Sequence, residues 1–310
     1  MTQAKFLGAA VALALVQHAL AANDLLTRAI QGAAAIKWNQ PQEPVRIYGE
    51  TYYVGVAGLS SVLIHTEKGL ILLDGDLPQS VPLIEANIRK LGFRVEDVKY
   101  ILNSHAHFDH AGGIAALARD SGAVVVASPR SAEGLRLGHA TADDPQAGYA
   151  DLAREDPAIF PAVTSAIREV HDGEELRLGA TRITAHFTPG HTPGATTWTW
   201  QQCVSNQCLH IVYADSLNAI AAPGFHFLAD TTHADRTEDF RKSIHTVADL
   251  PCDVLISVHP DLADVPEKLA SAVRGATPNP FIDPQACRKY AQDAEQLLDA
   301  RISQERKAAH

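Results

Sequence analysis

The sequence lacks an excess of positive charge. It contains 26 Lys and Arg residues against 36 Asp and Glu residues, which gives a formal net charge of −10 at pH 7. An acidic chain is repelled by the phosphates of nucleic acids and by anionic lipid headgroups. We therefore expect neither a nucleic-acid partner nor a membrane partner.

The sequence also lacks a hydrophobic run long enough to cross a bilayer. The apolar stretch from Phe6 to Val16 covers 11 residues, whereas a transmembrane helix needs about 20. Lys5 precedes this stretch, and Ala19-Leu20-Ala21 follows it with the small residues of a cleavage site. The pattern predicts a signal peptide over residues 1–21, cleavage after Ala21 and a periplasmic protein, with an uncleaved anchor as the alternative.

Cysteine is scarce, and its even count is compatible with an oxidising compartment. The four residues, Cys203, Cys208, Cys252 and Cys287, allow three pairings. Cys203 and Cys208 flank a polar tip between two β-prone runs, which favours a local disulfide and leaves Cys252–Cys287. Closing that longer loop would stabilise the fold by roughly 3–4 kcal/mol in the chain-entropy model. A cysteine-rich metal site is not favoured, because two C-x-x-C motifs are absent.

Hydrophobic periodicity predicts a single domain, over residues 22–310, that mixes strands and helices. Four strands separated by short spacers predict an antiparallel meander from Val45 to Asp74. The expected later strands cover 98–102, 123–126, 175–178, 181–187, 196–200, 209–213 and 254–258, and the expected helices cover 81–91, 114–119, 238–248 and 285–302. In the last helix we expect Leu297 on the buried face with Tyr290 and Leu298. The polar segment 138–161 shows no period, and its role is left open.

The strongest functional signal is a cluster of metal-ligating residue types directly after the strand 98–102. Within six positions the chain carries His105, His107, Asp109 and His110. His105 and His107 are two residues apart, so they share one face in extended geometry. The Gly112-Gly113 pair that follows lets backbone pass close to a crowded site.

Four clustered ligands exceed the three that one catalytic metal usually takes from the protein, so the pattern predicts two metal ions. The missing ligands are expected from other strand ends. His191 lies in the turn Thr188–Gly194, and His259 directly follows the strand 254–258.

The motif H-x-H-x-D-H resembles that of the metallo-β-lactamase superfamily, and the chain looks most like a subclass B3 metallo-β-lactamase. The resemblance extends from Tyr48 through His191 to His259. The subclass assignment depends on His105 as first ligand, on Ser216 where other subclasses place a cysteine ligand, and on the paired cysteines near the C-terminus. The resemblance implies an α/β (α+β) fold, the αββα sandwich, with the active site in a groove at one edge.

The resemblance also implies roles for individual residues. The first zinc ion would be bound by His105, His107 and His191, and the second by Asp109, His110 and His259. Nitrogen and oxygen ligands suit zinc, although iron or manganese would also accept them. Asp109 would also be the catalytic residue that orients a hydroxide held by the two Zn²⁺ ions, and Ser216 and Asn218 would contact the substrate.

The implied activity is hydrolysis of the β-lactam amide bond of penicillins, cephalosporins and carbapenems, without a covalent intermediate, and hence antibiotic resistance. The protein would act as a monomer on a small-molecule substrate. The same fold hosts hydrolases of the glyoxalase II type and lactonases, in which Asp215 would bridge the metals. A non-enzymatic zinc-buffering protein is the remaining alternative. Trp38 is expected to pack rather than to recognise substrate.

Overall fold

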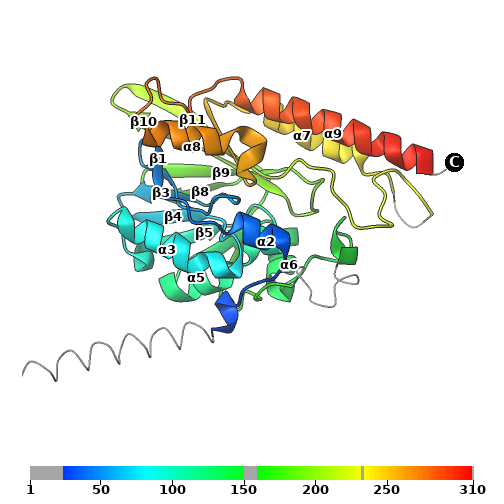
Figure 1. Ribbon diagram of the computed structural model, residues 1–310, viewed down its shortest axis with the longest axis horizontal. Coiled ribbons are helices and arrows are strands. Elements are labelled where there is room, and N and C mark those ends of the chain that lie inside the picture. Colours follow the sequence, from blue (N-terminus) through cyan, green and yellow to red (C-terminus); the bar gives the residue numbers. More distant parts are fainter. Residues whose placement is uncertain (1–23, 150–158, 232–233, 309–310) are drawn as a thin grey trace, which may run out of the picture.

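The computed structural model describes residues 24–149, 159–231 and 234–308. The predicted signal peptide and its cleavage site lie outside the described residues. Two β-sheets form the centre of the molecule, and helices cover the outer face of each sheet (Figure 1). This arrangement confirms the predicted αββα sandwich.

The first sheet has seven strands in sequence order. They are β1 (Val45–Tyr48), β2 (Thr51–Tyr53), β3 (Val62–Thr66), β4 (Gly69–Leu73), β5 (Val98–Leu102), β6 (Val124–Ala127) and β7 (Ile167–Glu169). Strands β1 to β4 pair antiparallel, as the predicted meander requires, and β4 to β7 pair parallel. The parallel strands β4, β5 and β6 therefore end at the same edge of the sheet.

The second sheet has five strands in the order β12-β11-β10-β9-β8. They are β8 (Glu175–Leu178), β9 (Thr181–Phe187), β10 (Thr196–Val204), β11 (Gln207–Ala214) and β12 (Val254–Ser257). Strands β8 to β11 are antiparallel, and β12 adds to β11 in parallel. The carboxyl ends of β11 and β12 consequently lie side by side.

Helices cover the two outer faces (Figure 1). Those from the first half of the chain are α2 (Ala33–Trp38), α3 (Val81–Lys90), α4 (Phe108–Ala111), α5 (Ile114–Ser121) and α6 (Pro129–Leu137). Those from the second half are α7 (Thr237–Asp249), α8 (Val265–Val273) and α9 (Ala286–Ala308). Figure 1 shows α3 and α5 on the outside of the first sheet and α7, α8 and α9 on the opposite side of the molecule.

The side chains of the first sheet alternate between two hydrophobic cores. Val62 and Ile64 of β3 point into the core shared with the second sheet, whereas Leu63 points toward the core under α3 and α5. Successive residues of a strand face opposite sides, and both faces of this sheet are covered. The strands therefore appear in the sequence as continuous apolar runs rather than as alternating patterns.

One expectation about helix α9 is wrong. The side chain of Leu297 is 45% exposed, whereas Tyr290, Ala294 and Leu298 are buried. Position 297 is three residues after 294 and seven after 290, so it lies at the edge of the buried face rather than opposite to it. Its side chain nevertheless reaches solvent. Helices α6 and α8 and strand β7 were not expected from the periodicity.

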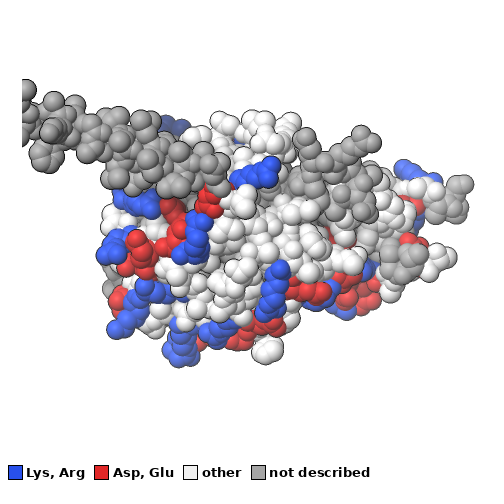
Figure 2. Space-filling view, turned by 90° about the horizontal axis from the view of Figure 1, so that it is seen from below, with Lys and Arg blue, Asp and Glu red and all other residues white. Residues whose placement is uncertain are grey.

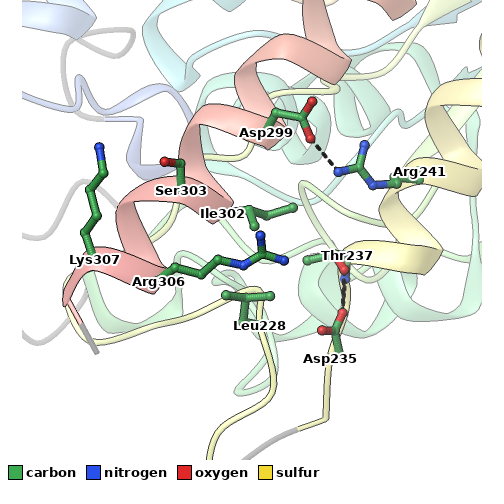
Figure 3. Close-up of a pocket in the computed structure, with 9 residues that line it drawn as sticks. All are labelled: Leu228, Asp235, Thr237, Arg241, Asp299, Ile302, Ser303, Arg306 and Lys307. Atoms are coloured by element: carbon green, nitrogen blue, oxygen red, sulfur yellow. Dashed lines mark hydrogen bonds and ion pairs between the residues drawn. The ribbon is translucent and has the colours of Figure 1, made fainter. Parts of the chain in front are cut away.

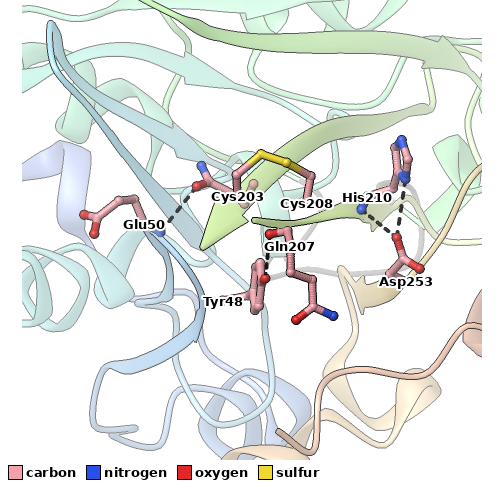
Figure 4. The surroundings of a disulfide bond; sticks show 8 residues. Tyr48, Glu50, Cys203, Gln207, Cys208, His210 and Asp253 are labelled. Atoms are coloured by element: carbon pink, nitrogen blue, oxygen red, sulfur yellow. Dashed lines mark hydrogen bonds and ion pairs between the residues drawn. A yellow bond between two sulfur atoms is a disulfide. The ribbon is translucent and has the colours of Figure 1, made fainter. Parts of the chain in front are cut away.

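The structure contains two disulfides, and they are the two pairs suggested by the sequence. Cys203 and Cys208 lie opposite each other in β10 and β11 and close the tip of that hairpin (Figure 4). The hydroxyl of Tyr48 in β1 donates a hydrogen bond to the Gln207 carbonyl at this tip, at 2.9 Å. The second disulfide, Cys252–Cys287, joins the segment before β12 to α9.

Charges of both signs are interspersed on the face seen in Figure 2, which shows the molecule of Figure 1 from below. On this face neither sign forms a large continuous area. Within the described residues, no helix combines the length and the apolar character that a membrane span requires.

Candidate metal centre

The predicted ligands lie where several strands end at one edge of the sandwich. His105 and His107 follow the carboxyl end of β5, and His259 follows that of β12. His191 lies in the turn between β9 and β10. Residues from three separate strand ends can thus reach one place, which is common for functional sites built on loops over a rigid scaffold.

A buried carboxylate fixes the loop that carries the histidine motif. Asp74, at the end of β4, accepts hydrogen bonds at Oδ1 from the Ser104 backbone amide (2.8 Å) and from Asn103 Nδ2 (3.2 Å). Its other oxygen accepts a hydrogen bond from the Tyr213 hydroxyl of β11 at 2.9 Å. Asp74 therefore links the two sheets directly behind the candidate site.

The glycine pair after the motif allows the close backbone approach that the sequence suggested. A Cβ atom at Gly112 would lie 2.3 Å from the Phe108 carbonyl oxygen, and one at Gly113 would lie 2.2 Å from the Gly75 carbonyl oxygen. Such distances are far inside van der Waals contact, so a side chain at Gly112 would displace α4 and one at Gly113 would displace the backbone at Gly75. This helix places Asp109 and His110, which the sequence suggested would lie in a turn.

The structure brings His105, His107 and His191 together. The ring centroids lie 4.7 to 5.1 Å apart, and the ligand atoms of the three residues lie within 4.8 Å of one another. His105 is fully buried, and its Nε2 atom has no hydrogen-bond partner. A buried nitrogen with a free lone pair is costly unless something binds it, and a metal ion would remove that cost.

Asp109, His110 and His259 form a second group of three. Asp109 Oδ2 lies 3.4 Å from His110 Nε2 and 3.5 Å from His259 Nε2, and the two nitrogens are 3.2 Å apart. Tetrahedral ligands at zinc bond lengths are separated by about 3.3–3.4 Å. The three atoms therefore fit one such ion. The ring centroids of His105 in the first group and His110 in the second are 4.4 Å apart, so the two groups of candidate ligands are adjacent.

In the first group, the ring nitrogen that faces away from the ligand cluster is held by the protein. His105 Nδ1 lies 2.6 Å from Asp215 Oδ1, His107 Nε2 lies 3.1 Å from Asp144 Oδ1, and His191 Nδ1 donates to the Asn218 carbonyl at 2.8 Å. Metal-binding histidines commonly donate their second N–H to a carboxylate or carbonyl, which fixes the tautomer and the ring orientation. This pattern is a further sign of a metal site.

Burial and mutual repulsion lower the pKa of several of these imidazoles. Burial, followed by the charge of His107, lowers the pKa of His191 to about 3. Burial, followed by the charge of His110, lowers the pKa of His259 to about 4. His110 differs: burial alone would lower its pKa, but the charge and hydrogen bond of Asp109 outweigh that effect and raise it to about 9. Neutral imidazoles have the lone pairs that a metal ion requires.

We expect the metal-free protein to lose stability as the pH falls from about 6.5 toward 4. His191 and His259 have folded pKa values below the ordinary 6.5, so unfolding takes up protons in this range, at about 1.4 kcal/mol per pH unit for each proton. The raised pKa of His110 affects stability at higher pH. Its stabilising contribution to the free energy of unfolding is complete below pH 6.5 and is lost as the pH rises toward 9.

Urea unfolding of the metal-free protein at a series of pH values measures this dependence. A free energy of unfolding that is constant from pH 6.5 to 4 would contradict the proposed burial of neutral histidines. The same series with the His191→Gln variant should show a shallower slope, because one of the groups that takes up a proton is removed.

The predicted substrate contacts lie beside this cluster. Ser216 is buried and its Oγ atom has no hydrogen-bond partner, so the hydroxyl is available to a ligand. Asn218 already contributes its backbone carbonyl to His191. The ring of Trp38 packs against His259, with centroids 5.6 Å apart, and a Cβ at Gly58 would overlap the Trp38 backbone. Trp38 thus packs, as expected, but it does so against a candidate ligand.

Two carboxylates contact the ligand rings without being part of the motif. Asp215 was considered only as a metal-bridging residue, but its Oδ1 faces the outer nitrogen of His105. Asp144 was not predicted, because it lies in the aperiodic segment 138–161 and is 37 residues from His107. The sequence signal that could have found it is weak, namely an Asp-Asp pair in an otherwise featureless loop.

A hollow of about 640 Å³ lies elsewhere, between α7 and the end of α9 (Figure 3). None of the nine residues that line it is a predicted site residue. Its charged groups include Arg241, which pairs with Asp299, and Asp235, which accepts hydrogen bonds from Thr237. These groups satisfy one another, so we place the candidate site at the histidine cluster instead.

Comparison with known proteins agrees with the fold and the motif. The family description of the metallo-beta-lactamase superfamily matches residues 54–202. The solved structure of Rm3 metallo-beta-lactamase is 47% identical, has a TM-score of 0.83, and is covered over 99% of its length by 89% of this chain. The structure of MEM-A1, a subclass B3 metallo-beta-lactamase from a soil metagenome library, is 46% identical with a TM-score of 0.81, and 87% of this chain covers 99% of it.

A curated relative is similar over a shorter stretch. Hydroxyacylglutathione hydrolase from Anaeromyxobacter dehalogenans is 33% identical over 103 residues, which are 33% of this chain and 29% of that protein. The matched stretch therefore spans less than a third of that relative.

The fold and the near-complete coverage of the solved relatives establish the family. The chain belongs to the metallo-β-lactamase superfamily. Its solved relatives at 34–47% identity include subclass B3 metallo-β-lactamases, which confirms the resemblance seen in the sequence.

Proposed function

We propose that this protein is a metallo-β-lactamase that uses two zinc ions to hydrolyse the amide bond of penicillins, cephalosporins and carbapenems, and so confers antibiotic resistance. The observation that supports the proposal best is the pair of adjacent triads. His105, His107 and His191 would hold the first ion, and Asp109, His110 and His259 the second. Six ligands of nitrogen and oxygen, with no thiolate, suit Zn²⁺.

When bound, two divalent cations supply an activated water at neutral pH and stabilise negative charge on the carbonyl oxygen. The residues of the chain provide the positioning. Asp109 would contact the second ion through Oδ2, which leaves its other carboxylate oxygen to orient the attacking water. The unpartnered hydroxyl of Ser216, with the side chain of Asn218, would contact the substrate carboxylate.

A covalent intermediate is not expected at this site. Ser104 Oγ lies 3.4 Å from His105 Nδ1, but Ser104 is fully buried behind the histidine. The Ser104 hydroxyl contacts the His105 nitrogen that also faces Asp215, on the side of the ring away from the ligand cluster. The proposed route is therefore direct attack by an activated water, without an acyl-enzyme.

We also propose that the protein is a monomer, that residues 22–310 form one domain, and that the mature chain works in the periplasm after removal of residues 1–21. The two disulfides support the periplasmic assignment, because disulfides persist in oxidising compartments.

A panel of substrates measured with and without a chelator tests the function. We expect chelator-sensitive hydrolysis of a penicillin, a cephalosporin or a carbapenem, and little hydrolysis of an acyl-homoserine lactone or a glutathione thioester. The opposite pattern would favour the thioesterase or lactonase alternative, which the similarity to hydroxyacylglutathione hydrolase makes worth testing. Tight zinc binding without turnover of any substrate would favour a zinc-buffering protein.

A further inference from the structure

Asp144 makes an unexpected contact with the candidate metal centre. Its two carboxylate oxygens lie 3.1 and 3.2 Å from His107 Nε2, and its side chain is almost fully buried. Its neighbour Asp143 has a different environment, because that carboxylate is exposed and pairs with Arg130. Two adjacent residues of the same type therefore have separate tasks.

The segment around Asp144 is held firmly in place. Asp144 Oδ1 accepts a hydrogen bond from the Gln146 backbone amide at 2.7 Å, and the Asp144 amide donates to the Thr141 carbonyl at 2.9 Å. The end of this segment is held by the chain that follows β11, because the Tyr149 hydroxyl donates a hydrogen bond to the Ala221 carbonyl at 3.1 Å. The carboxylate is thus preorganised against the His107 ring.

The contact decides which nitrogen of His107 is free. A neutral imidazole has one N–H and one lone pair. With the Nε2 hydrogen directed at Asp144, the lone pair is on Nδ1. The other two histidines of the triad, His105 and His191, are held at Nδ1, so their Nε2 atoms carry the lone pairs. That of His105 has no partner, and that of His191 lies 3.3 Å from Gln146 Nε2. His107 must therefore adopt the opposite tautomer from the other two histidines.

We propose that Asp144 is a positioning residue that fixes the tautomer and ring orientation of His107 and thereby sets how tightly the first metal ion is retained. Through this residue the segment 139–149 becomes part of the metal centre, although it supplies no ligand. The proposal depends on the proposed function only in assigning His107 to a metal ion.

The test compares three purified, zinc-loaded variants with the wild type. Asp144→Asn keeps an acceptor oxygen but removes the charge, Asp144→Ala removes both, and Asp143→Asn is the matched control. Competition with a colorimetric chelator measures zinc affinity, and the nitrogen chemical shifts of ¹⁵N-labelled histidine report the tautomer of His107. Circular dichroism checks the fold of each variant.

We expect zinc to be released about 10- to 100-fold more easily from one of the two positions in Asp144→Ala. Asp144→Asn should be intermediate, Asp143→Asn should match the wild type, and the His107 signal should change only in the Asp144 variants. Wild-type zinc affinity and an unchanged His107 tautomer in folded Asp144→Ala would overturn the proposal.

The readouts separate this inference from the proposed function. If the wild type binds two zinc ions but hydrolyses no β-lactam, the function fails, while the effect of Asp144 on zinc retention is still measured. If the wild type hydrolyses β-lactams and the Asp144 variants keep both ions, the inference alone fails.

Discussion

Replacing Asp109 with asparagine is expected to lower kcat for β-lactam hydrolysis by about 10²- to 10⁴-fold, the range associated with removing a positioned acid–base group. Asp109 Oδ2 lies within 3.5 Å of both His110 Nε2 and His259 Nε2. Asparagine has the same shape but carries no negative charge, so it binds a cation more weakly and orients a water less strongly. Steady-state kinetics with a cephalosporin would measure the loss.

The Asp109→Asn experiment needs a control for fold and a measure of metal content. Asp120→Asn removes an exposed carboxylate on α5 that pairs with Arg119, and we expect its kcat to equal that of the wild type. Zinc content of the Asp109 variant distinguishes loss of the second ion from loss of water orientation alone. Wild-type turnover in folded Asp109→Asn would show that this carboxylate has no catalytic role.

Removal of metal is expected to abolish hydrolysis completely, and added zinc should restore it. Each proposed ligand of the two triads is a side chain that the fold brings to one edge, and in the proposed mechanism only the bound ions activate the attacking water. The metal-free protein should stay folded but melt at a lower temperature, because an ion that binds only the native state stabilises it by about 4 kcal/mol at a concentration of 1,000 Kd.

Dialysis against a chelator, followed by titration with zinc, provides the measurement for this prediction. Magnesium serves as the control, because it prefers oxygen ligands in octahedral geometry and should not restore activity to a site rich in imidazole. Activity that persists in protein shown to be metal-free would eliminate the proposed mechanism.

Local sequence patterns were sufficient to predict most of the strands and helices. The strands from Val45 to Asp74 form the expected meander because each is short, apolar and separated by tight turns. Helix α3 begins and ends within one residue of its prediction. Helix α6 was missed because its apolar positions are few, and it is defined instead by the Ser128 cap and by Gly138 after its last residue.

The exposed Leu297 shows the limit of counting apolar residues. Leu297 and Leu298 are chemically the same in the sequence, and helical spacing alone does not exclude either, because the neighbours Tyr290 and Ala291 of this helix are both buried. Only the packing of α9 against α7 and the second sheet decides that Leu298 is buried and Leu297 is exposed.

By itself, the sequence determined the family, the meander of the first four strands and the six residues that we propose as ligands. The spacing of the H-x-H-x-D-H motif is local, and strand ends are positions from which side chains can meet. What only the tertiary structure decided is which groups orient those ligands. Asp144 and Asp215 reach His107 and His105 across 37 and 110 residues of chain. No local pattern encodes such contacts, because the folding of the loop after α6 creates the first and the packing of the two sheets creates the second.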